Sequence, residues 1–351
     1  MPSAESFTLL LIFSEALIFV RPFRRQQHSI ARKAVQRFYR YYTCRVNTVV
    51  IWDDVVTPIT LTFENNCEAN DMEADRILRQ YAAGERNFRE INLAGADLQG
   101  VNLSEANFTT ANFQDANLKG ANLTGANLRE VKLPGVDLTE ANLTEANLIG
   151  TDLSRANLSG ANLMGANLRG PMAREVNMTK ANLTEANLTE ANFTEANLFA
   201  ANLTDASMIR INLMKANLSW STLKAVNLTN AILSESLLER ANLNQAVLSG
   251  AMLSGANLTG ADLRQVTMIG ANLSEANLSN ANLRVANVSW STLAKANLSG
   301  ANLYRAKLCW SNFSGAILME AVLIDANLNR TNFRDADLRR AIMPDGTTND
   351  S

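Results

Sequence analysis

The chain has 351 residues, of which 47% are hydrophobic and 19% are charged, and its formal net charge is -2. This composition excludes a chain that is disordered throughout, because enough apolar residues are present to build a large core. The single histidine, His28, and three cysteines without a CxxC pairing provide no catalytic triad, zinc site or disulfide framework. We therefore predict no enzyme activity, metal or cofactor, and a reducing, cytoplasmic location.

Residues 1–71 are predicted to be an extension that is basic and apolar. Residues 7–20 are almost entirely apolar, but this stretch is short for a membrane-spanning helix. Residues 1–50 carry eight Arg or Lys against two Glu, a balance of +6. Residues 1–45 are thus a candidate for attachment to an anionic membrane surface, or for weak nucleic-acid binding. The alternative is that translation starts at Met72 and the upstream residues are a disordered extension.

Residues 72–85 have the spacing of an amphipathic helix. Their apolar residues fall on one helical face: Ala74, Ile77, Leu78 and Tyr81. Gly84 stands where a helix commonly ends. The segment after this helix consists of short tandem repeats, described below. Such repeats need a cover at each end, because each repeat buries its apolar face against a neighbour. We therefore predict a capping helix over 72–85.

Residues 86–343 repeat with a period of five. A central apolar residue recurs 52 times from Phe88 to Met343, and it is large in every repeat except at Ala173. The residue two positions earlier is usually Ala, and the residue between is Asn or Asp in 38 of the 52 repeats. Each unit must be a short strand plus a corner, because a period of five fits neither a helix nor a long strand.

Glycine marks the corners of these repeats. Fifteen of the 17 glycines occupy the second corner position, where a type II turn requires a positive φ. Where Glu, Arg, Asn or Trp occupies that position, we expect another turn type.

The pattern, seen cleanly in ANLTEANLTE from Ala181, resembles the pentapeptide-repeat family over roughly residues 72–346. The resemblance implies an all-β fold, a right-handed quadrilateral β-helix in which four repeats form one coil. The 52 repeats would then form about 13 coils, followed by a C-terminal tail over residues 344–351. Large apolar side chains would fill the axis, so any function would lie on the outer walls.

Taking every twentieth residue sorts the outward residues into walls. Ile269, Trp290 and Trp310 fall at corners of successive coils and should touch. They form a candidate interaction stripe, although stacked aromatic residues can also be simple ladder packing.

Another wall separates charges along its length. Its first half carries acidic residues and its second half basic residues: Glu105, Glu145, Glu185 and Asp205, then Lys224, Arg264, Arg284 and Arg305. This polarity could direct self-association into a homodimer, and the alternative is an ordinary solvated surface.

Pro171 and Ala173 interrupt the pattern. Proline at an inward small position should break a ladder hydrogen bond, and Ala173 should leave a gap that Met172 or Met178 fills. The sequence therefore predicts a local bulge or, alternatively, a functional kink.

These features favour a rigid scaffold or protein-protein interaction module that binds a protein partner. The family resemblance implies one alternative, a modulator of DNA gyrase that imitates duplex DNA. Such mimicry needs a strongly acidic surface, whereas the corner positions sum to about +2. Nucleic-acid binding by the repeats is disfavoured. The other alternative is a structural protein held at a membrane surface by its N-terminal segment.

Overall fold

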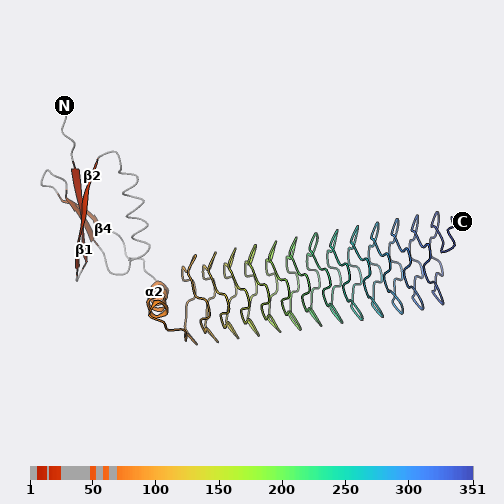
Figure 1. Ribbon diagram of the computed structural model, residues 1–351, viewed down its shortest axis with the longest axis horizontal. Helices are drawn as coiled ribbons and strands as arrows, with labels where there is room; N and C mark the ends of the chain where they lie inside the picture. Colours follow the sequence, from red (N-terminus) through yellow and green to blue (C-terminus); the bar gives the residue numbers. More distant parts are fainter. Residues whose placement is uncertain (1–5, 14–15, 25–47, 53–57, 63–68, 351) are drawn as a thin grey trace, which may run out of the picture. The chain divides into compact units, whose positions relative to one another are not determined.

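The computed structural model describes residues 6–13, 16–24, 48–52, 58–62 and 69–350 (Figure 1). The chain divides into two compact units, Met1–Asp75 and Arg76–Ser351. Each unit is described by itself.

The first unit contains one antiparallel sheet of four strands in the order β2-β1-β3-β4. The strands are β1 (Ser6–Phe13), β2 (Ala16–Arg24), β3 (Thr48–Trp52) and β4 (Pro58–Thr62). The apolar stretch of the sequence thus forms most of the β1–β2 hairpin. The basic residues from 25 to 45 lie outside the described part. Within the described ranges, no helix is long and apolar enough to cross a membrane.

Helix α2 (Ala69–Ala82) leads into the repeats. It begins and ends three residues earlier than the predicted range 72–85. It ends there because the chain enters the left-handed region at Gly84, with φ of 98°, and the Gly84 amide donates to the Tyr81 carbonyl at 3.0 Å. The Ile77 side chain is fully buried, and the Tyr81 hydroxyl donates to the Ser104 carbonyl at 3.0 Å. The last turns of the helix therefore cover the start of the repeat core.

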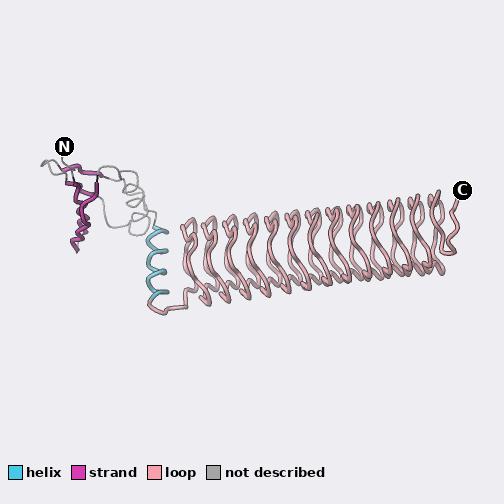
Figure 2. The backbone as a smooth tube through the Cα atoms, turned by 45° about the horizontal axis from the view of Figure 1, so that its top comes forward, coloured by secondary structure: helices cyan, strands magenta, loops and turns pink. Residues whose placement is uncertain are grey.

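The repeats form a solenoid in which each residue lies beside the residue twenty positions later. Parallel bridges join Asn87 to Asn107 and continue with the same offset to the pair Val322 and Ile342. Four pentapeptides therefore make one coil, and Figure 2 shows these coils stacked one on the next. Each repeat contributes a single bridge residue, so the coils are held by many very short strands.

Every backbone amide of a typical repeat has a hydrogen-bond acceptor. The amides of Asn122, Leu123 and Gly125 donate to carbonyls of neighbouring coils at 2.7–2.9 Å. The amide of Ala121 closes the preceding turn at 3.0 Å. The amide of Thr124 donates to the Asn122 Oδ1 at 3.2 Å. Stacking thus satisfies backbone groups that an isolated coil would leave without partners.

All corners share one backbone conformation, so the expected change of turn type at corners without glycine is wrong. From residue 90 to residue 340, the second corner position has φ between 53° and 69°, whether or not it is glycine. Even the β-branched Val285 has φ of 60°. This conformation costs a non-glycine residue about 1 kcal/mol. The ladder bond from the corner amide and the turn bond after it fix the same conformation in most repeats.

The solenoid axis is a closed apolar core. The central residues from Leu93 to Leu323 are at most 1% exposed, and the small residues two positions earlier line the same axis. Serine and threonine at some of those small positions donate to carbonyls, as Ser221 does to Leu218 at 2.7 Å. No buried side-chain nitrogen or oxygen in the described part lacks a hydrogen-bond partner.

Candidate interaction surfaces

The solenoid offers its outer walls, because side chains fill its interior. Within the described ranges, no group of three His, Cys, Asp or Glu residues could hold a metal ion. His28, Cys44 and Cys67 lie outside the described residues, and Cys309 is a free thiol. Any site in the repeats must therefore be a surface rather than a pocket in the core.

Asparagine stiffens the walls, a role that the sequence analysis missed. The Asn122 Oδ1 accepts the amide of Thr124, while its Nδ2 donates to the Asn102 Oδ1 of the preceding coil at 2.9 Å. One side chain thus fixes both its own corner and the distance to its neighbour. The signal was present in the frequency of Asn before the central residue, because Asn readily closes turns of this kind.

The predicted aromatic stripe contains a stacked pair. The rings of Trp290 and Trp310 lie 4.8 Å apart with planes 7° from parallel, and the two residues are 59% and 43% exposed. The Arg330 guanidinium covers the far side of this pair, 4.2 Å from the Trp310 ring centre. Ile269, 41% exposed, stands at the first corner position of the coil before Trp290. We call Ile269, Trp290 and Trp310 the aromatic column.

The corner one coil before Trp290 that corresponds to it carries no side chain. The equivalent corner one coil earlier is Gly270, and a Cβ atom there would meet no atom within 4 Å. Elsewhere in the described solenoid an arginine from the following coil covers an exposed indole, as Arg240 covers Trp220 at 4.8 Å. Gly270 therefore leaves open space at the corner one coil before Trp290, which we call the open shelf.

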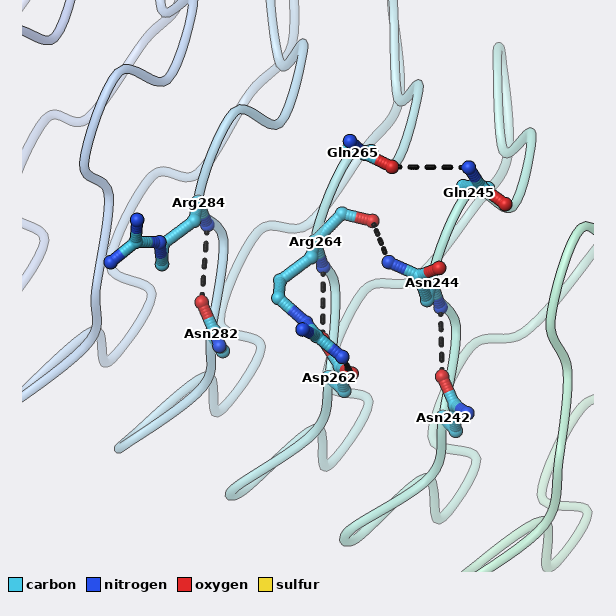
Figure 3. Close-up of polar contacts among 8 residues, drawn as sticks. All are labelled: Asn242, Asn244, Gln245, Asp262, Arg264, Gln265, Asn282 and Arg284. Atoms are coloured by element: carbon cyan, nitrogen blue, oxygen red, sulfur yellow. Dashed lines mark hydrogen bonds and ion pairs between the residues drawn. The ribbon is translucent and has the colours of Figure 1, made fainter.

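A second surface is the wall that separates charges, part of which Figure 3 shows. Arg264 and Asp262 form an ion pair at 2.6 Å, and the Asn244 Nδ2 donates to the Arg264 carbonyl at 3.1 Å. Partial burial acts to raise the pKa of Asp262, but the hydrogen bonds and charge of Arg264 outweigh it and hold that pKa below its usual range. Arg264 is thus already neutralised within its own coil.

Arg284, one coil further on, is different. Its amide donates to the Asn282 Oδ1 at 3.3 Å, and its guanidinium lies 4.7 Å from the Tyr304 ring centre. No carboxylate of the described residues pairs with it. Figure 3 shows its guanidinium pointing away from the neighbouring polar side chains. Arg284 therefore presents an unneutralised charge to solvent.

The interruption at Pro171 leaves the ladder continuous. The Met172 amide donates to the Thr151 carbonyl at 2.9 Å, and the Pro171 carbonyl accepts the Asn192 amide at 3.0 Å. The expected loss of a ladder bond is wrong, because the amide at this position closes a turn in the other repeats. Met172 is 56% exposed and does not fill the core beside Ala173. A functional role for this interruption stays a prediction.

Comparisons with known proteins define the class of this fold. The pentapeptide-repeat family profile matches eight segments between residues 87 and 340. The chain therefore belongs to the pentapeptide-repeat family, whose members of known structure form right-handed quadrilateral β-helices. No match was found among curated protein sequences.

Several solved structures are similar to the chain. HetL of the cyanobacterium Nostoc sp. strain PCC 7120, involved in regulating heterocyst differentiation, is 32% identical. The match covers 78% of this chain and 98% of HetL, with a TM-score of 0.28. A pentapeptide-repeat protein of the Arabidopsis thaliana thylakoid lumen is 30% identical over 30% of this chain and 70% of its own, with a TM-score of 0.24. QnrB1, a plasmid-mediated fluoroquinolone resistance protein, is 18% identical over 57% of this chain and 90% of its own, with a TM-score of 0.25.

Proposed function

We propose that this protein is a rigid, non-enzymatic scaffold of about 13 coils that binds a protein partner through the aromatic column. The carrying observation is the stacked Trp290–Trp310 pair, which leaves more than two fifths of each residue in contact with water. Large aromatic side chains are the usual anchors of protein interfaces, because covering them removes much apolar surface from water.

The solenoid suits this role because it holds the column in place before binding. The amides of Trp290 and Trp310 donate to carbonyls of the next coil, both at 3.0 Å. The two rings restrain each other by stacking. A partner therefore loses little affinity to the ordering of these side chains, which is the general advantage of a preorganised surface.

The open shelf indicates what the partner contributes. Arg330 over Trp310 and Arg240 over Trp220 show that a guanidinium fits against an indole at the spacing of one coil. Such contacts combine ring stacking with attraction between the cation and the π face. We expect the partner to present an arginine that enters the shelf beside Gly270 and stacks on Trp290.

Affinity capture with the purified full chain tests this proposal. Trp290→Ser should lose the captured partner. Gly270→Arg should lose it too, because the new side chain fills the shelf from within. Gly100→Arg is the matched control, since it adds the same charge at a corner with φ of 67° against 68° and equally open space. If both variants capture the wild-type set of partners, the aromatic column is not the binding site.

The charge distribution favours this proposal over DNA mimicry. A surface that replaces the phosphates of a duplex must be strongly acidic, and the corner positions here sum to about +2. Inhibition of DNA gyrase supercoiling by submicromolar protein would reverse this ranking.

A further inference from the structure

The wall that separates charges is complementary to itself. We define the charged wall as outward positions 102, 104 and 105 together with every twentieth residue after each, as far as 325. We propose that two copies of the chain associate through this wall in antiparallel orientation. Their two-fold axis runs across the wall between the coils of Asp205 and Lys224.

The two halves of this wall carry opposite net charge. Its acidic half, positions 102 to 205, carries four carboxylates and no cation. Its basic half, positions 222 to 325, carries four cations and two carboxylates, Asp262 and Asp325, which pair with Arg264 and Arg305. The net charges of the halves are therefore -4 and +2. A parallel pair would oppose like charges, whereas an antiparallel pair opposes unlike ones.

Six of these charged groups have no ionic partner within the described part of the chain. They are all four carboxylates of the acidic half together with Lys224 and Arg284 of the basic half, and all six are exposed. None of them belongs to an ion pair. Arg264, by contrast, is bound to Asp262. An occupant of the wall should therefore bring opposite charge to unpaired groups and leave Arg264 alone.

The proposed axis neutralises four of these six groups. The coils of Asp205 and Lys224 are adjacent, because residues pair with those twenty positions away, and the axis brings these two charges together. Glu145 lies three coils before Asp205, and Arg284 lies three coils after Lys224, so these two also meet. Arg264 lies two coils after Lys224 and is already neutralised by Asp262. It meets the coil of Gly165, two coils before Asp205, and Gly165 has no side chain. The same axis overlaps the whole wall with itself. It places Glu185 opposite the uncharged Asn244 and Gln245, and Glu105 opposite Asp325, which is paired with Arg305.

The lateral positions agree with this arrangement. The four charges that the axis pairs stand at the two corner positions that border one edge of the wall, the carboxylates at the second and the cations at the first. A two-fold axis in the plane of the interface and perpendicular to the rod reverses direction along the rod but keeps each edge facing itself. Opposite charges therefore meet on the same edge in both halves of the pair.

The size of the wall sets the strength of the association. Its coils, spaced by about 4.8 Å, give a length of about 50 Å, and three extended residues give a width of about 10 Å. The pair would bury roughly 1,000 Å² in total, the low end for specific interfaces. We therefore expect a weak dimer that salt dissociates, since exposed charges are screened beyond about 10 Å at 0.1 M salt.

This association is independent of the proposed partner site. The aromatic column borders the next edge of the solenoid, and its residues are not part of the charged wall. Loss of partner capture with an intact dimer, or the reverse, would separate the two proposals.

Sedimentation velocity of the full chain tests the dimer. The wild type should form dimers at about 50 mM salt and monomers at about 500 mM. Glu145→Lys/Asp205→Lys changes the net charge of the wall from -2 to +2, and Lys224→Glu/Arg284→Glu changes it to -6. Each double variant alone should be monomeric at low salt. An equimolar mixture should recover wild-type dimer, because every designed contact then pairs opposite charges.

The control variant, Glu140→Lys/Glu195→Lys, reverses the charge of two residues on other walls. It should dimerise like the wild type. Recovery in the mixture also shows that both variants fold. A wild type that stays monomeric at low salt, or single variants that dimerise unchanged, would overturn the proposal. A mixture that fails to recover the dimer would overturn it as well.

Discussion

The two ends of the solenoid are finished differently. At the N-terminal end, helix α2 buries Ile77 completely, and the first central residue, Phe88, is only 3% exposed. At the C-terminal end, the tail adds one antiparallel bridge between Ile342 and Thr348. The last central side chains stay half-buried: Leu328, Phe333, Leu338 and Met343.

This difference shows what a cap contributes to a repeat protein. An interior coil has a neighbour on each side. These neighbours bury its apolar residues and accept hydrogen bonds from its backbone amides. A terminal coil lacks one neighbour, and stability in such arrays is a sum of repeat and neighbour terms. We therefore expect the C-terminal coils to open before the N-terminal coils.

Creating new ends in the middle of the solenoid should have the largest effect. Deleting Asn202 shortens one coil by a residue. An inserted residue could bulge out at a corner, but a missing residue leaves the coil too short to close. The twenty-residue pairing then fails there, and two uncapped faces replace one interior contact. We expect a loss of roughly 5 kcal/mol or more in the free energy of unfolding. Chemical denaturation followed by circular dichroism measures it.

Asn202→Ala is the control for this deletion. It keeps the period and removes only the bonds to Thr184 and Thr204, so it should cost about 1 kcal/mol. A deletion variant no less stable than this control would contradict the closed twenty-residue coil.

Matched truncations at the two ends should differ next most. Ile77→Ala leaves a cavity under the helix and should cost about 2–4 kcal/mol. Leu338→Ala at the half-buried end should cost about 1 kcal/mol, since its side chain is already partly in water. Hydrogen exchange should show the first loss in the N-terminal coils and the second in the C-terminal coils. Equal costs would mean that the ends are equally well covered.

Corner strain should have a smaller effect that does not depend on position. The φ values of Glu90 and Arg340, at opposite ends, are 59° and 60°, so strain does not distinguish the ends. Val285→Gly should relieve about 1 kcal/mol of strain and add about 0.5 kcal/mol of unfolded-chain entropy. We expect a net gain of about 0.5 kcal/mol, measured as a higher midpoint of denaturation. A loss would show that Val285 contributes more through packing than it costs in strain.

Much of this fold could be predicted from the sequence, because the five-residue period ties each side chain to one direction. The central residues and the contact between Trp290 and Trp310 follow from that period and the four-sided coil. The corner at Val285 could not be predicted, because neighbouring coils override its local preference. The hydrogen bonding at Pro171 could not be predicted either, because the sequence does not show which amide of a repeat closes the turn. The open shelf at Gly270 is a candidate site only because the indole of Trp290 lies one coil away.

Acid should loosen both ends through different carboxylates, the smallest effect we expect. Hydrogen bonds from the amides of Asn87 and Arg86 hold the pKa of Glu85 below its usual 4.5. The Thr347 hydroxyl and amide lower the pKa of Asp345 from 3.8. A depressed pKa stabilises the fold above the unfolded value, and this stabilisation is lost as pH falls through the folded value.

Neither end should therefore change between pH 7 and pH 5, and both should open more easily below about pH 4. Hydrogen exchange, corrected for its intrinsic pH dependence, resolves the two ends. Glu85→Gln should abolish the acid response of the first coil only, and Asp345→Asn that of the last coil only, so each variant is the control for the other. If both variants kept the full acid response at both ends, the end carboxylates would not be its source, and groups within the coils would have to be.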